Sequence, residues 1–216
     1  MQTVTNVYAG TSENANLSNF ALRPFETRIG KFDTVEGAFQ AAKIYYTNGT
    51  KYLIRDDKGK PTGLTEEGKY VIRRLMTASG SDARSIGRNI SDLNKKVWDE
   101  ISAKFLEDFM RRSFEQNPQA RKELTNTGNS IITHKNQQGV EQDKGRFSSI
   151  LTKIRDEFKS LLPNPNSNKI EQHIGDWSRT EVEQHPNYLY IFTDNTDRDS
   201  GSQPVDPNSK YARKYG

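Results

Sequence analysis

The chain of 216 residues contains no cysteine and three histidines. Without cysteine it can form no disulfide bond, offers no thiol nucleophile and cannot bind zinc through thiolates. His134, His173 and His185 lie far apart without metal-ligand spacing, so we expect no metal site. The absence of cysteine fits a protein of the cytoplasm, where thiols are kept reduced and disulfides are rare.

Hydrophobic residues make up 32% of the chain and charged residues 28%, which predicts a small core with many long polar side chains outside. No stretch reaches the roughly 18 apolar residues of a membrane span. Met1–Val7 lacks the basic start and apolar run of a signal peptide. The net charge of +4 is compatible with a phosphate-bearing ligand but is too small to indicate nucleic-acid binding by itself.

Residues 34–46 form the stretch on which the site prediction depends. Thr34 is suited to cap a helix, and Glu36 then falls in its first turn, where a carboxylate is favoured. At helical spacing one broad apolar face collects Val35, Ala38, Phe39, Ala42, Tyr45 and Tyr46.

Glu36, Gln40 and Lys43 form a separate polar stripe on the same predicted helix. Glu36 and Lys43 are about two turns apart, roughly 10 Å of rise, which is too far for a direct ion pair but leaves space for a small polar ligand. The alternative is a solvated face on an ordinary core helix, and spacing alone does not separate the two interpretations.

Apolar periodicity and cap residues predict a mainly α fold with a few short strands (α+β). The helices are expected at about 34–46, 65–76, 82–88, 93–115, 118–126 and 147–162. Short strands are expected near Val4–Tyr8 and Ser130–His134, and residues 50–64 look like a charged surface excursion.

The sequence predicts one domain over residues 1–162 and a linker over 163–187, which begins with Pro163-Asn164-Pro165. Residues 188–216 form a C-terminal segment of different texture. We interpret that segment as the start of a truncated second module or as a flexible tail.

Further candidate residues lie outside the polar stripe, and motifs for a serine nucleophile or a phosphate loop are absent. Arg84 and Arg88 share a helix face and suit a phosphate clamp, Trp98 suits stacking on a base, and Asp143 offers a second carboxylate. Each has a plain alternative: surface arginines are common, and a tryptophan on a long helix usually belongs to the core.

Several short motifs occur together in a fixed order. They are Asn19-Phe20, Thr34-Val35-Glu36-x-x-Phe39-Gln40-Ala41-x-Lys43, Ala83-Arg84-x-x-Gly87-Arg88, Trp98, Phe114-x-Gln116-Asn117-Pro118 and Leu124-x-x-Thr127-Gly128. In these motifs the chain resembles the NADAR (YbiA-like) family over about residues 5–162.

This resemblance implies a mainly helical domain with short strands and an N-glycosidase activity on ribosylated bases, without a metal or cofactor. Some family members act on a riboflavin-pathway intermediate. Others remove ADP-ribose from guanine in DNA or RNA, as the reversing partner of a guanine ADP-ribosyltransferase.

The resemblance also implies roles for individual residues. Glu36, Lys43 and Asp143 are expected to be catalytic. The expected substrate-binding residues are Asn19, Phe20, Gln40, Arg84, Gly87, Arg88, Trp98 and His134.

Three departures from the family pattern disfavour the riboflavin-type substrate. The position where members often have glutamate is His134 or is absent, Phe147 stands where tryptophan is common, and a G-x-N-x-L-G segment is missing. We therefore expect an ADP-ribosyl-guanine N-glycosidase. The alternatives are a hydrolase of a ribosylamino-pyrimidine phosphate, a non-catalytic module that binds ADP-ribose or a related nucleotide, and a helical interaction protein.

Overall fold

The computed structural model describes residues 3–10 and 14–161. The chain divides into two units, Met1–Ser167 and Asn168–Gly216, and the described residues all belong to the first. The predicted linker at 163–187 and the predicted C-terminal segment at 188–216 lie outside the described residues.

Helices dominate the described part, as the sequence predicts. The α-helices are α1 (Val35–Ala42), α2 (Glu66–Met76), α3 (Gly80–Arg88), α4 (Lys95–Glu115), α5 (Pro118–Asn126) and α6 (Arg146–Ser160). Three short 3-10 helices accompany them: η1 (Ala15–Leu17), η2 (Lys43–Tyr46) and η3 (Asp143–Gly145). Within the described residues, no helix combines the length and apolarity needed to cross a membrane.

The strands form three separate pairs. The predicted strands are present as β1 (Val4–Asn6) and β6 (Ile131–Thr133), which pair in parallel with Val4 opposite Ile131. Two antiparallel hairpins were not predicted: β2 (Phe25–Thr27) with β3 (Gly30–Phe32), and β4 (Leu53–Arg55) with β5 (Pro61–Leu64). Strands of three or four residues are too short to display an alternating pattern, so residues 50–64 were expected to be a charged surface excursion rather than a hairpin.

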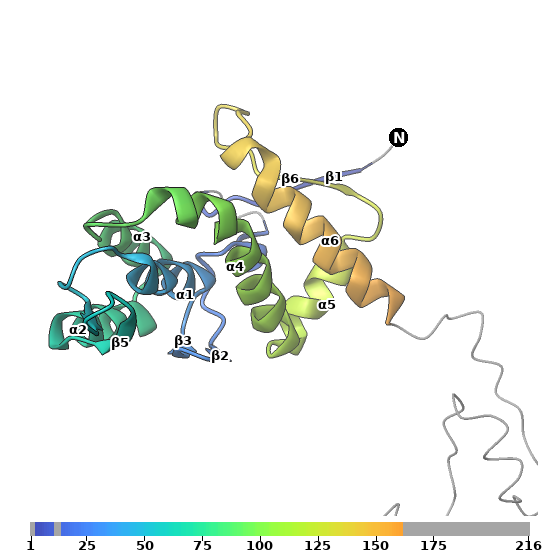
Figure 1. Cartoon of the computed structure of the whole chain (residues 1–216). Helices are drawn as coiled ribbons and strands as arrows, with labels where there is room; N and C mark the ends of the chain where they lie inside the picture. Colours follow the sequence, from blue (N-terminus) through green and yellow to red (C-terminus); the bar gives the residue numbers. More distant parts are fainter. Residues whose placement is uncertain (1–2, 11–13, 162–216) are drawn as a thin grey trace, which may run out of the picture. The chain divides into compact units, whose positions relative to one another are not determined.

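Helix α1 lies at the centre of the packing, in contact with α2, α3 and α4. Figure 1 shows α4 running beside both α1 and α6. The Thr34 hydroxyl accepts a hydrogen bond from the Gly37 amide at 3.0 Å, which confirms the predicted cap. Val35, Ala38 and Ala41 are fully buried. Small side chains let neighbouring helices approach α1 closely, so its position is fixed from several directions.

Helix α3 begins earlier than predicted. Ser79 is the cap, and its hydroxyl accepts a hydrogen bond from the Asp82 amide at 3.2 Å. Gly80 is the first helical residue and lies against Phe20, because a Cβ atom at position 80 would be 2.4 Å from the Phe20 Cβ atom. The absence of a side chain at position 80 permits this close approach.

Replacing Gly37 with alanine is expected to lower the free energy of unfolding by about 1–3 kcal/mol, the usual cost of overpacking a core. A Cβ atom at position 37 would lie 2.4 Å from the Leu75 carbonyl oxygen, which belongs to the backbone of α2. Denaturant unfolding measures the change. Gly63→Ala is the control, since its Cβ would meet only the Ile54 Cδ1 atom at 3.8 Å. Equal stability of Gly37→Ala and the parent would contradict the close α1–α2 contact.

Candidate functional site

A cavity of about 320 Å³ lies among α1, α3, α4 and the segment that leads into α6. Its polar lining residues are Asn19, Glu36, Arg84, His134, Asp143 and Arg146, with Ser18 and Gln142 beside them. Its aromatic and apolar lining residues are Tyr8, Phe39, Leu106 and Phe147. Five of the residues predicted for the site thus meet around one space, although they come from distant parts of the chain.

Glu36 is the buried carboxyl of this cavity, with 8% of its surface exposed. The Gln40 side-chain amide donates a hydrogen bond of 2.7 Å to Glu36 Oε1, and the Glu36 backbone amide donates one of 3.1 Å to the Asn19 carbonyl oxygen. Gln40 itself is 5% exposed. The polar stripe of α1 is therefore not a solvated face, and that alternative is wrong for these two residues.

Burial raises the pKa of the Glu36 carboxyl above its ordinary value, because a charged carboxylate is less stable away from water. The Gln40 hydrogen bond opposes this effect, followed by the positive charges of Arg84, Lys43 and Arg88. A carboxyl with such a raised pKa can exchange a proton at a higher pH than an exposed glutamate. This property is typical of general acids and bases.

Lys43 follows α1 and is half-buried without lining the cavity. Burial lowers the pKa of its ammonium group, and the charge of Glu36 partly opposes that effect. The ion pairs of the described residues do not include one between Lys43 and Glu36. Lys43 therefore acts on the carboxyl through space.

Asp143 and Arg146, which both line the cavity, form an ion pair with each other. Arg146 Nη2 lies 2.8 Å from Asp143 Oδ1, and Arg146 Nε lies 2.9 Å from Asp143 Oδ2. Asp143 and Lys144 both have positive φ angles, 52° and 51°, a conformation that costs non-glycine residues free energy. A strained backbone conformation persists only where the surrounding structure holds it in place. Of the two residues in this conformation, Asp143 lines the cavity.

His134 is fixed by its ring nitrogen, which lies 2.6 Å from the Val7 carbonyl oxygen. Because a carbonyl only accepts, Nδ1 carries the proton in this contact. The ring also packs against Phe147 with 4.5 Å between ring centroids. The His134 imidazole therefore lines the cavity in a fixed orientation, next to Phe147.

Arg84 is exposed and lines the cavity, whereas Arg88, one turn further along α3, is exposed and does not line it. Both arginines lie near enough to act on the charge of Glu36. The predicted arginine pair is therefore split, with one residue at the cavity and one beyond it.

Trp98 does not line the cavity and is 6% exposed. Its ring packs against Phe39 at 5.1 Å and against Phe105 at 5.9 Å between centroids. Stacking of Trp98 on a base is thus at odds with its position, because the ring is buried among other aromatic rings of the core. The position of Trp98 agrees with the alternative interpretation, in which it is a core tryptophan on the long helix α4.

Three further residues predicted for substrate binding lie outside the cavity lining. Phe20 packs against Gly80, and Gly87 lies against the Gln40 side chain. Gln40 reaches the cavity only through Glu36.

Arg146, conversely, was missed by the sequence reasoning. Its spacing of three residues from Asp143 is compatible with an ion pair on one helical turn, and this signal could have revealed it.

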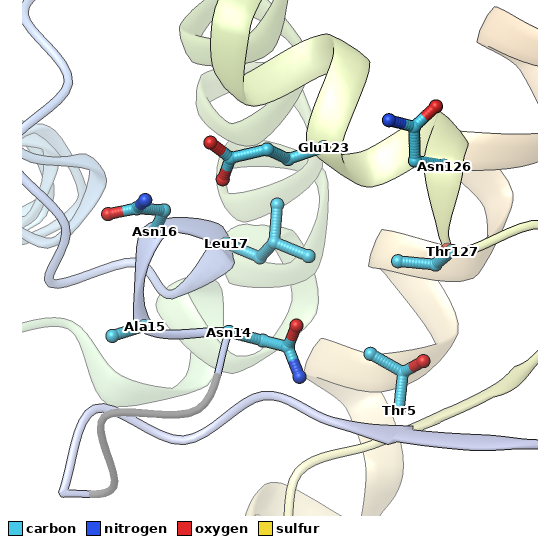
Figure 2. A pocket seen from close by; sticks show the side chains of 8 residues that line it. All are labelled: Thr5, Asn14, Ala15, Asn16, Leu17, Glu123, Asn126 and Thr127. Atoms are coloured by element: carbon cyan, nitrogen blue, oxygen red, sulfur yellow. The ribbon is translucent and has the colours of Figure 1, made fainter.

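A second cavity of about 540 Å³ lies elsewhere in the first unit (Figure 2). It is lined by Thr5, Asn14, Ala15, Asn16, Leu17, Glu123, Asn126 and Thr127. No residue predicted for the site is among them, so the smaller cavity around Glu36 is the candidate site. Within the part of the chain that the structure describes, no group of three or more histidine, aspartate or glutamate side chains could hold a metal ion.

Comparisons with known proteins agree with this fold. N-glycosidase YbiA of Shigella flexneri serotype 5b (strain 8401) is 25% identical over 163 residues, covering 72% of this chain and 89% of the relative, and N-glycosidase YbiA of Shigella flexneri matches equally well. The NMR structure of the E. coli protein YbiA superposes with a TM-score of 0.56 at 23% identity. That alignment covers 81% of this chain and 92% of the other, and it supports the mainly α fold. No family model matches the chain.

The raised pKa of Glu36 gives a testable dependence of stability on pH. In the unfolded chain the carboxyl ionises at its ordinary pKa, whereas in the folded protein it keeps its proton to higher pH. Folding is therefore favoured by this group below the ordinary pKa, and that contribution is lost as pH rises through the raised pKa. Glu36→Gln should gain stability relative to the parent over this interval, as measured by urea unfolding from pH 4 to pH 8.

The control for this measurement is Glu100→Gln, which removes an exposed glutamate of α4. It should leave the pH dependence of the parent nearly unchanged. A difference between Glu36→Gln and the parent that stays constant across the interval would contradict the burial of an ionisable carboxyl at position 36.

Proposed function

We propose that this chain, which belongs to the NADAR (YbiA-like) family, is an N-glycosidase that hydrolyses the bond between ribose and base in ADP-ribosylated guanine of DNA or RNA. The relatives named N-glycosidase support hydrolysis of an N-glycosyl compound. The observation that carries the proposal is the buried Glu36 carboxyl, which lines a cavity that also contains Arg84 and Arg146.

The chemistry of the bond explains why a carboxyl is needed. As the carbon–nitrogen bond breaks, its electron pair leaves with the base and positive charge builds on the ribose. A nearby carboxylate stabilises that charge and accepts a proton from the water that attacks the anomeric carbon. The guanine nitrogen takes up one proton, and the products are ADP-ribose and a nucleic acid with unmodified guanine. Glu36 is suited to both tasks, because it is screened from bulk water beside the cavity.

The charged groups around Glu36 suit the rest of such a substrate. Arg84 lies at the cavity with an exposed guanidinium, a donor set that pairs well with a diphosphate. We propose that Asp143 acts as the second carboxylate and accepts hydrogen bonds from ribose hydroxyls or water, beside those from Arg146. We propose that Lys43 supports Glu36 by its charge, since it does not line the cavity where the leaving base would lie. The mixture of cationic and anionic groups distinguishes this cavity from a purely apolar pocket.

The proposed substrate places requirements on its context. A guanine in a duplex must leave the base stack before its glycosidic bond can be reached, so single-stranded or looped nucleic acid should react faster. We further propose that the protein acts in the cytoplasm and reverses the product of a guanine ADP-ribosyltransferase.

The direct test mixes the protein with an oligonucleotide that carries ADP-ribosyl guanine and measures free ADP-ribose by mass spectrometry. Release supports the proposal. Release of base from a ribosylamino-pyrimidine phosphate alone would indicate the small-molecule alternative. Binding of ADP-ribose without turnover of either substrate would indicate a binding module.

Glu36→Gln is expected to lower kcat by about 10²–10⁴, the usual scale for losing a positioned acid–base group, while leaving the fold and ADP-ribose affinity close to those of the parent. Single-turnover kinetics with the modified oligonucleotide measures the rate. Glu100→Gln again provides the matched control and should react at the parent rate. Near-normal turnover by Glu36→Gln would remove Glu36 from the mechanism.

Arg84→Ala is expected to weaken ADP-ribose binding by at least about tenfold, the scale of one hydrogen bond to a charged group. Arg88→Ala should weaken binding less, because Arg88 does not line the cavity. Isothermal titration calorimetry with ADP-ribose compares the two variants. Equal affinities of Arg84→Ala and the parent would reject Arg84 as a phosphate ligand.

A further inference from the structure

Gln40 and Gly87 connect α3 to the Glu36 carboxyl without touching the cavity. Gln40 is one turn beyond Glu36 on α1, and its Nε2 atom donates a buried hydrogen bond of 2.7 Å to Glu36 Oε1. Neither Gln40 nor Gly87 lines the cavity. A role for these two residues must therefore act through Glu36 rather than through direct contact with a substrate.

The carbonyl oxygen of the Gln40 side-chain amide, Oε1, is held by packing. Among the described residues, Gln40 Oε1 has no hydrogen-bond partner, although the atom is buried. It lies against α3 at Gly87, where an added Cβ atom would be 1.9 Å from Gln40 Oε1 and 2.3 Å from Gln40 Cδ. Any larger residue at position 87 would displace the amide, so the missing side chain of Gly87 creates the space that the amide occupies.

We propose that Gln40 and Gly87 are positioning residues, which hold the Glu36 carboxylate at the cavity and set the pH range over which it works. This inference rests on the proposed function of Glu36. Gly87 fixes the place of the amide, and the amide donates to one carboxylate oxygen and leaves the other for water or ribose. Gln40 and Gly87 were both expected to bind substrate, and in this proposal they act on the substrate only through Glu36.

The surrounding charges allow the effect of the amide to be isolated. Arg84 and Arg88 face Glu36 from α3, and Lys43 acts on it from the end of its own helix. Tyr8, His134, Asp143 and Arg146 line the same cavity from other segments. All these groups remain when Gln40 is changed. Since the amide lowers the pKa of Glu36 against the effect of burial, its removal should raise that pKa further.

The experiment compares Gln40→Met, which keeps the approximate size of the side chain and removes the donor, with the parent. The expected kcat is lower by about 10- to 100-fold, the scale of a hydrogen bond to a charged group, and the acidic limb of the pH–kcat profile moves to higher pH. The affinity for ADP-ribose should stay within about twofold of the parent, because the interaction lost is one with Glu36. Gln119→Met makes the same chemical change at an exposed position of α5 and should alter none of these quantities.

Gly87→Ala extends the test to α3 and should shift the pH profile in the same direction as Gln40→Met. Ser85→Ala, an exposed change on the same helix, is its control. A shift of the pH profile separates positioning from general damage, because a loss of stability alone lowers the amount of active protein without moving the limb. Gln40→Met keeps the proposal testable if Gly87→Ala fails to fold.

A carbon-13 NMR titration of the Glu36 carboxyl in the parent and in Gln40→Met needs no substrate. A higher pKa in Gln40→Met supports the positioning role even if the modified oligonucleotide is not cleaved, an outcome that would count against the proposed function alone. An unchanged pKa overturns the inference. So does a Gln40→Met protein that loses ADP-ribose affinity while keeping the parent pH profile, since that result would make Gln40 a substrate ligand.

Discussion

The separation of the Glu36 carboxyl from bulk water is the constraint around which the candidate site is built. A buried charge of this kind is unfavourable unless donors and opposite charges compensate for lost hydration. Here the Gln40 amide supplies a hydrogen bond, while Arg84 and Arg88 approach from α3. Helix α1 can hold the group in place because α2, α3 and α4 contact it. The stability of the core and the chemistry of the cavity therefore depend on the same helix.

The cavity brings together segments that are distant in sequence. Asn19 comes from the segment before the first hairpin, Glu36 from α1, Arg84 from α3, and His134 and Asp143 from the region around β6 and η3. The parallel pairing of β1 with β6 joins the beginning of the chain to this last region, where the Val7 carbonyl accepts the hydrogen bond from His134. The proposed N-glycosidase reaction on an ADP-ribosylated base would need a carboxyl close to the sugar and hydrogen-bond donors for the diphosphate, and this cavity contains Glu36 together with Arg84 and Arg146.

The sequence predicted the helices well because their caps and apolar stripes are local features. Thr34 and Thr65 cap α1 and α2, and Pro118 begins α5 as expected. Spacing also placed Glu36 and Gln40 on one stripe, but burial depends on tertiary packing, so the sequence could not show that the stripe is enclosed. The same limitation applies to Trp98, whose aromatic neighbours on α1 and α4 become visible only in the fold. Arg146 was missed because its three-residue spacing from Asp143 is compatible with an ion pair but does not show that the pair lies at a cavity, which depends on the fold.

The most direct test of the central claim is a crystal structure of Glu36→Gln with a bound ADP-ribosylated guanosine. We predict that the anomeric carbon of the guanine-linked ribose lies within contact distance of the side chain at position 36, with the diphosphate toward Arg84. A substrate that binds in the second cavity near Glu123, or one whose glycosidic bond points away from position 36, would contradict it.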